Sequence, residues 1–267
     1  MPAIDLARLK KQAAALADFF DQPGDFVRAL HDTLDFYVNR SLREVDAVAP
    51  ASVLKTYRTP PVILKHIETE LAALAAEKSI QALDLADRLW DEGWLETRLL
   101  AASLLGRIPP REERLLPRLT AWTLQVRDPS VRAALLTTSL ARLRQETPER
   151  FLLLVSEWLN PERQRMWPNG IQALLPLIQD PNFHNLPPVF EMLTGVVEAA
   201  PGVLQSDFVD LFQSLHKASP TETVYFLRQV IANSSGPMTA TTFRRISSSL
   251  PPEISDAIRD LVKRQRT

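Results

Sequence analysis

Three arginines recur at a regular spacing in the middle of the chain and could bind phosphate groups. Arg98 and Arg132 are 34 positions apart, and Arg165 follows 33 positions later. A guanidinium group carries a planar fork of N–H donors that matches phosphate oxygens, so a row of arginines suits a nucleic-acid backbone. The competing interpretation is that each arginine pairs with an Asp or Glu of a neighbouring repeat. We take Arg98, Arg132 and Arg165 as candidate nucleic-acid-binding residues.

The charge distribution also favours an anionic partner for this region. Residues 98–165 contain 12 arginines against seven acidic residues, a net charge of +5, whereas residues 1–97 carry −5 and the whole chain −1. A basic segment of this kind is typical of a nucleic-acid-binding surface, although ordinary solvated helix surfaces also carry such charge. The charge of this region is therefore compatible with an anionic partner.

Two tryptophans are candidates for contact with a partner. Trp94 and Trp167 lie at expected helix ends, next to Gly93 and Pro168, where an indole ring can stay partly exposed. Exposed aromatic side chains are frequent hot spots of protein interfaces. The alternative is that each ring packs across the corner of a helical hairpin.

Other chemistry finds little support in the residue types. The chain has no cysteine, so it has no disulfide, thiolate ligand or cysteine nucleophile. Its seven glycines form no phosphate-binding loop, and the serines at 247–249 lack a strand–turn–helix context. We therefore expect no metal, no cofactor and no catalytic residue that the sequence can name. The histidines are also too scattered for a zinc site: His31, His66, His184 and His216.

The elements that would position these residues are helices. Apolar residues recur at i, i+3, i+4 and i+7 in most of the chain, as in the stripe that starts at Phe151 and includes Trp158. Many of the 21 prolines follow a capping side chain, as in Thr59-Pro60 and Asp128-Pro129, which is typical of a helix start. This pattern predicts helices at 4–19, 25–38, 60–77, 80–92, 94–107, 111–126, 129–145, 148–159, 168–179, 188–199, 206–217, 220–233, 239–249 and 252–264.

The helix pairs recur about every 35 residues, with short connections between them. Such spacing is typical of a repeat architecture. We therefore predict an all-α fold, an α-α superhelix in which antiparallel helical hairpins stack as a HEAT-like solenoid. An irregular helical bundle is the alternative. The chain is expected to form one domain, 1–267, with a bend or subdomain seam near 181–188.

One stretch carries a resemblance to a known family. The block Leu89–Ala102, LWDEGWLETRLLAA, resembles a motif of the bacterial HEAT-like DNA alkylation repair enzymes, which are alkylpurine DNA glycosylases. Tyr57–Pro60, YRTP, is similar to that family's threonine-proline helix entry. The resemblance covers roughly residues 50–108. It implies a curved stack of helical pairs with a basic concave face that holds duplex DNA around a cationic, damaged purine.

The same resemblance implies a tryptophan followed closely by an aspartate, which stabilise the departing base. This sequence departs from that pattern. Trp122 lies on the apolar stripe of its helix and is interpreted as a core residue, while Asp128 precedes Pro129 and is interpreted as a helix cap. No catalytic residue is therefore transferred from the family. If catalysis is retained with relocated residues, the search for them begins at Trp122, Asp128 and Trp167.

The sequence thus leaves three functions open. The first is a HEAT-like module, non-catalytic or of unknown activity, that binds a macromolecule such as DNA on a concave surface. The second is a glycosylase for alkylated purines with relocated catalytic residues, and the third is a protein–protein interaction scaffold.

No stretch approaches the roughly 18 apolar residues of a membrane span, and residues 1–20 resemble an amphipathic helix more than a secretion signal. We expect a cytoplasmic protein.

Overall fold

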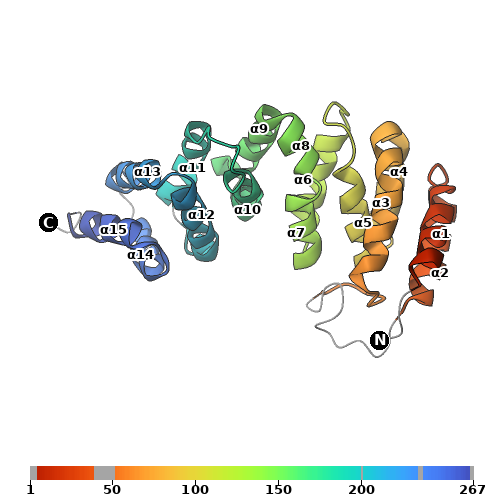
Figure 1. Cartoon of the computed structure of the whole chain (residues 1–267). Coiled ribbons are helices and arrows are strands. Elements are labelled where there is room, and N and C mark those ends of the chain that lie inside the picture. The colour runs from red at the N-terminus through yellow and green to blue at the C-terminus, as the bar shows by residue number, and fades with distance from the viewer. Residues whose placement is uncertain (1–4, 39–51, 200, 234–236, 265–267) are drawn as a thin grey trace. The chain divides into compact units, whose positions relative to one another are not determined.

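The computed structural model describes residues 5–38, 52–199, 201–233 and 237–264 (Figure 1). Every regular element in these ranges is a helix, and one isolated bridge joins Lys55 to Trp94. The all-α prediction is therefore confirmed for the described residues. Internal contacts divide the chain into two compact units, Met1–Pro148 and Glu149–Thr267. The bend expected near 181–188 falls inside the second unit, between two of its helices.

The first unit consists of helices that pack against the next helix but one. Contacts join α1 to α3, α3 to α5, α5 to α7 and α2 to α4, while α3 and α5 each also pack on α4. This pattern places alternate helices side by side in two layers, as stacked hairpins require (Figure 1). The helices are α1 (Leu6–Ala17), α2 (Pro23–Phe36), α3 (Pro61–Glu77), α4 (Ser79–Asp91), α5 (Leu95–Leu105), α6 (Leu115–Gln125), α7 (Pro129–Thr137) and α8 (Ala141–Glu146).

The second unit repeats this arrangement. Here α10 packs on α12, α12 on α14, α11 on α13 and α13 on α15. No described helix is both long and apolar enough to cross a membrane. The elements are α9 (Pro148–Trp158), η2 (Pro161–Met166), α10 (Trp167–Ile178), α11 (Pro187–Ala199), η3 (Gly202–Leu204), α12 (Gln205–Ala218), α13 (Pro220–Asn233), α14 (Pro237–Ile246), η4 (Ser247–Ser249) and α15 (Pro252–Arg264).

Hydrogen bonds between neighbouring helices have the expected spacing of about 35 residues. The Gln172 amide donates to Asp207 at 2.8 Å, and the Gln179 amide donates to Ser214 at 3.1 Å, both over 35 positions. In the first unit the Ser139 hydroxyl donates to the Ala102 carbonyl at 2.7 Å, over 37 positions. These contacts join equivalent layers of successive hairpins within each unit. They agree with the predicted repeat length, while the HEAT-like superhelix remains a prediction.

Two details of the predicted elements are wrong. Thr59 does not cap a helix, because Pro60 is followed by Pro61: a residue before proline avoids the α region, so Pro60 stays extended at ψ 139° and α3 begins at Pro61. The helix expected at 129–145 is interrupted between α7 and α8. At this interruption the Thr138 carbonyl approaches Gly106 so closely that a Cβ there would lie 2.2 Å from its oxygen.

Candidate functional site

Arg98 and Arg132 occupy equivalent places in neighbouring helices. Each is the fourth residue of its helix, α5 or α7, and these two helices pack together. The Arg98 guanidinium carbon lies 4.9 Å from the centre of the Trp90 ring, and Nε donates to the Trp90 carbonyl at 3.2 Å. Arg132 is half-buried, and its side chain forms no hydrogen bond or ion pair with a described residue. Neither arginine has a described carboxylate partner.

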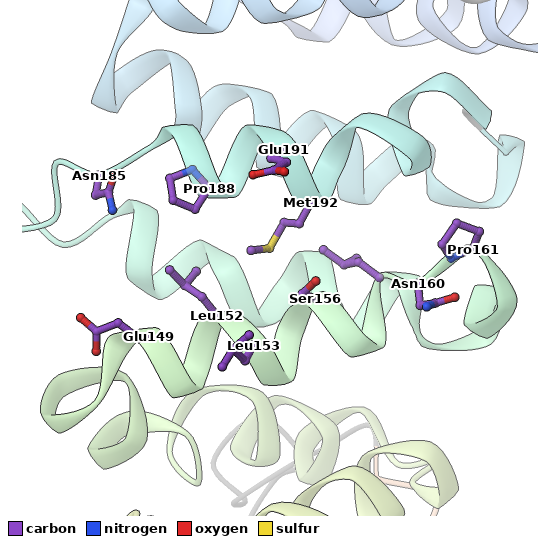
Figure 2. Close-up of a pocket in the computed structure, with 11 residues that line it drawn as sticks. Glu149, Leu152, Leu153, Ser156, Asn160, Pro161, Asn185, Pro188, Glu191 and Met192 are labelled. Carbon is purple, nitrogen blue, oxygen red and sulfur yellow. The ribbon is translucent and has the colours of Figure 1, made fainter.

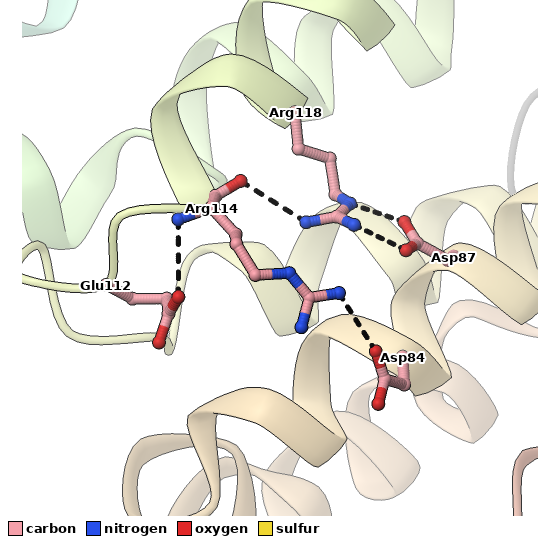
Figure 3. A network of polar contacts seen from close by, with 5 residues as sticks. All are labelled: Asp84, Asp87, Glu112, Arg114 and Arg118. Carbon is pink, nitrogen blue, oxygen red and sulfur yellow. Dashed lines mark hydrogen bonds and ion pairs between the residues drawn. The ribbon is translucent and has the colours of Figure 1, made fainter.

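Two other arginines form the ion pairs between neighbouring hairpins. In Figure 3, Arg114 and Arg118 at the start of α6 reach the carboxylates of Asp84 and Asp87 on α4. The Arg114–Asp84 distance is 3.1 Å, and Arg118 binds both oxygens of Asp87 through two guanidinium nitrogens. The Arg118 side chain is only 16% exposed. Internal ion pairing therefore applies to these arginines, and their charge is neutralised within the protein.

Arg165 stands apart from this pair. It belongs to η2 in the second unit, whereas Arg98 and Arg132 belong to the first. Its side chain is exposed and forms no ion pair with another described residue.

The two candidate tryptophans have different environments. Trp167 is 3% exposed, and its indole nitrogen donates to the Asn160 carbonyl at 3.0 Å, which favours packing at a hairpin corner over contact with a partner. Trp94 is half-buried and stacks on Tyr57, with ring centres 4.3 Å apart and planes inclined by 21°. Lys55 Nζ lies 5.9 Å from the centre of the Trp94 ring. Trp94 is thus part of an aromatic cluster.

Local backbone geometry brings this cluster together. Gly93 adopts a left-handed φ of 71° between α4 and α5, a conformation that favours glycine, and Trp94 follows it directly. The segment Ser52–Pro60 crosses the start of α5, where the Leu95 amide donates to the Lys55 carbonyl at 2.8 Å. Arg58 in this segment has φ 56°, which is uncommon for a residue other than glycine. Tyr57 therefore lies against Trp94, at the turn between α4 and α5.

A chain of hydrogen bonds links Tyr57 to α2 and to the end of α4. Its hydroxyl lies 2.7 Å from Nδ1 of His31, and Nε2 of His31 lies 3.2 Å from a carboxylate oxygen of Glu92. The other Glu92 oxygen binds Arg88 at 2.6 Å. If the tyrosine donates to Nδ1, Nε2 must carry the proton that it donates to Glu92. Neutral imidazole therefore satisfies every partner in the chain.

The electrostatic field at Tyr57 is negative. Burial raises the pKa of Tyr57, and the nearby carboxylates of Asp35, Glu96, Glu92 and Asp32 raise it further. The phenol thus remains a protonated hydrogen-bond donor at neutral pH. Aromatic faces surrounded by carboxylates favour a cationic group over an anionic one. We refer to Tyr57, Trp94, His31 and Glu92 as the aromatic–carboxylate site.

The comparison with protein families shows to which family the chain belongs. The model of the DNA alkylation repair enzyme family matches residues 59–244, which is more than two thirds of the sequence. The chain belongs to this family. No curated protein and no solved structure matches it.

The family match extends well beyond the resemblance at residues 50–108. It includes Arg98, Arg132 and Arg165 together with Glu92 and Trp94. It begins at Thr59, so His31 and Tyr57 lie outside the region shared with the DNA alkylation repair family.

Within the described ranges, no group of three or more His, Cys, Asp or Glu side chains could hold a metal ion.

In this member of the DNA alkylation repair family, Trp122 and Asp128 have the roles that their sequence positions predict. Trp122 is 7% exposed and stacks on Trp90 at 4.1 Å with planes 7° apart, so its interpretation as a core residue is confirmed. Asp128 accepts hydrogen bonds from the amides of Ser130 and Val131, so its interpretation as a helix cap is also confirmed. Of the aromatic–carboxylate site, only Trp94 was predicted from the sequence; Tyr57, His31 and Glu92 were not. The only local signal was the Glu92-Gly93-Trp94 turn.

Proposed function

We propose that this member of the DNA alkylation repair family binds duplex DNA through the first unit, with its helical hairpins arranged as a HEAT-like superhelix. Arg98 and Arg132 contact the phosphate backbone. Family membership supports DNA as the partner. The superhelix, the DNA contact and the concave binding face are parts of this proposal.

The observation that carries the proposal is the contrast between two sets of arginines. Arg114 and Arg118 are neutralised by Asp84 and Asp87, whereas Arg98 and the equivalent Arg132 have no described carboxylate partner. An arginine already bound to a carboxylate gains little by binding a phosphate. Arg98 is also held in place by Trp90, so less conformational freedom is lost when its outer nitrogens bind.

Replacing both Arg98 and Arg132 with glutamine should weaken binding of a fluorescent 24-base-pair duplex and flatten its salt dependence. The wild type is expected to bind with Kd on the order of 10⁻⁴–10⁻⁶ M at physiological salt, as for sequence-independent binding. The slope of log Kd against log salt should fall by about one unit for each lost phosphate contact. Fluorescence anisotropy over a salt series measures both quantities.

The matched control is the double replacement of Arg114 and Arg118 with glutamine, which removes the same charge. Its salt slope should stay close to that of the wild type, while its thermal stability should fall because the ion pairs to α4 are lost. Equal slopes for the two double variants would contradict the proposal. Arg165→Gln is compared separately to test whether the second unit adds a contact.

The aromatic–carboxylate site favours a second candidate, a glycosylase for alkylated purines with relocated catalytic residues. When the bond from the sugar to a cationic purine breaks, the base departs neutral and positive charge develops on the sugar. The Glu92 carboxylate and the faces of Tyr57 and Trp94 could stabilise that charge. This second function differs from the first, in which the chain binds DNA but releases no bases.

The second candidate predicts that the wild type releases methylated purines from duplex DNA and that Glu92→Gln slows release at least tenfold. The amide keeps the shape of the side chain but removes its negative charge. Chromatography of the released bases under single-turnover conditions measures the rate. Asp84→Asn, which removes a carboxylate of α4 outside the cluster, should leave the rate unchanged. No release by the wild type would eliminate this candidate and leave DNA binding, and a chain that also fails to bind DNA would favour the protein scaffold.

A further inference from the structure

The second unit contains an open groove between α9 and α11 that neither candidate function uses. It has a volume of about 700 Å³ and lies within one compact unit. Figure 2 shows α9 and α11 lying alongside each other, with side chains of both helices facing the groove. The residues that matter for its chemistry are Leu152, Leu153 and Glu149 from α9 and Pro188, Glu191 and Met192 from α11.

The floor of the groove is apolar and accessible to solvent. Leu153 is 68% exposed, and Leu152, Pro188 and Met192 are half-buried. The core side of α9 is formed by other residues, including Phe151 and Trp158, which are fully buried. The exposed leucine face is therefore not needed to hold α9 in place. A contiguous exposed apolar surface with polar edges is typical of an interaction site.

The charged residues of the groove all have the same sign. Glu149 and Glu191 are acidic, and no Lys, Arg or His lines the groove. Neither glutamate forms an ion pair with another residue in the described ranges. Phosphate groups would be repelled from these carboxylates, whereas Lys and Arg side chains would be attracted to them. The groove is thus suited to a basic partner and not to DNA.

Its length matches a short helix. The lining residues of α9 run from Glu149 to Ser156, which corresponds to about 11 Å at 1.5 Å per residue, or two helical turns. An amphipathic helix of this length presents apolar side chains at i, i+3, i+4 and i+7 to such a groove. Its flanking positions would face the two glutamates.

We propose that the α9–α11 groove is a docking site for a basic amphipathic helix of a protein partner. Leucine-sized side chains of the partner cover Leu152, Leu153 and Met192, and its Lys or Arg residues pair with Glu149 and Glu191. The groove belongs to the second unit, whereas the proposed DNA contacts of Arg98 and Arg132 belong to the first.

The test uses the full chain and a fluorescent 14-residue helical peptide with leucines at i, i+3, i+4 and i+7 and lysines on its other face. Fluorescence anisotropy should show saturable binding. The same peptide with glutamate in place of lysine should bind at least tenfold more weakly, because it opposes the groove carboxylates. Replacing Glu149 and Glu191 together with glutamine should reduce that difference. Equal affinity for the two peptides would overturn the proposal.

A pair of matched surface variants separates this groove from non-specific binding. Leu153→Lys should weaken the lysine peptide at least tenfold, whereas Val203→Lys should leave its affinity unchanged, because Val203 is 84% exposed but lies outside the groove. Circular dichroism should show both variants folded, since neither side chain is buried. Equal losses in both variants would overturn the assignment. The assignment would also be overturned if the wild type formed a dimer and Leu153→Lys abolished it. The groove would then be occupied by a second copy of the chain.

Discussion

Replacing Trp158 with alanine should lower the free energy of unfolding of the second unit by about 3–5 kcal/mol. Trp158 is fully buried and is among the largest such side chains of the described core. It continues the α9 stripe that includes Phe151 and Val155, and the predicted core role of this stripe is confirmed. Alanine would remove the burial of the indole and leave a cavity that close-packed neighbours can fill only in part. Urea denaturation followed by far-UV circular dichroism measures the change.

Leu153→Ala is the control for this prediction, because Leu153 lies on the same helix and is 68% exposed. Its effect should stay within about 0.5 kcal/mol, as for most surface substitutions. The two values together test which face of α9 is inside. Unchanged midpoints for both variants would show that the Trp158 face is not packed as described.

The sequence could predict the helices because their signals are local. Apolar periodicity and proline positions gave the order of the helices and most ends to within a few residues, as for α9 at 148–158 against 148–159. The break between α7 and α8 has a different origin. It occurs where the Thr138 carbonyl meets Gly106 and the Ser139 hydroxyl bonds to Ala102, which are contacts between hairpins. No pattern within residues 129–145 indicates them.

The candidate site was predictable only where its residues carry a signal within the sequence. Arg98 and Arg132 share a position in two repeats, so their 34-residue spacing indicated that they would be equivalent. The aromatic–carboxylate site joins His31, Tyr57 and Glu92, which come from three separate stretches of the chain. A histidine and a tyrosine 26 positions apart carry no sequence signal of contact. Only the folded segment Ser52–Pro60 brings them together.

Asp128 anchors that segment, and Asp128→Ala should destabilise the first unit by about 2–4 kcal/mol. One carboxylate oxygen caps α7 through the amides of Ser130 and Val131, at 3.0 and 3.1 Å. The other accepts from the Ser52 hydroxyl at 2.7 Å and the Val53 amide at 2.9 Å. Alanine would therefore remove the cap and leave the groups of Ser52 and Val53 without this acceptor. Urea titration at pH 7 measures the loss.

Asp128→Asn distinguishes the role of Asp128 as the cap of α7 from its role as the acceptor that holds Ser52 and Val53. Asparagine is a good helix cap, so its amide oxygen can still accept from Ser130 and Val131, but its NH2 group would face two donors at Ser52 and Val53. The loss should therefore be smaller than for alanine and should concern mainly the segment that carries Tyr57. Hydrogen exchange of the Val53 and Leu95 amides should quicken in the asparagine variant, while that of the Val131 amide should not. Faster exchange at Val131 alone would contradict this division.

The contribution of Asp128 should also depend on pH. Burial raises its pKa, but the hydrogen bonds from Ser52, Val131, Val53 and Ser130 outweigh this effect, so the pKa lies below its usual value. A group with a depressed pKa in the folded state stabilises the protein fully above its unfolded pKa, about 3.9 for aspartate. That stabilisation is lost as the pH falls through the lower, folded pKa. The difference in unfolding free energy between the wild type and Asp128→Ala should therefore be constant from about pH 5 to 7 and shrink below about pH 4. A difference that grows on acidification would show that Asp128 is not the ionised acceptor that holds Ser52 and Val53 in place. The aromatic–carboxylate site would then depend on another anchor.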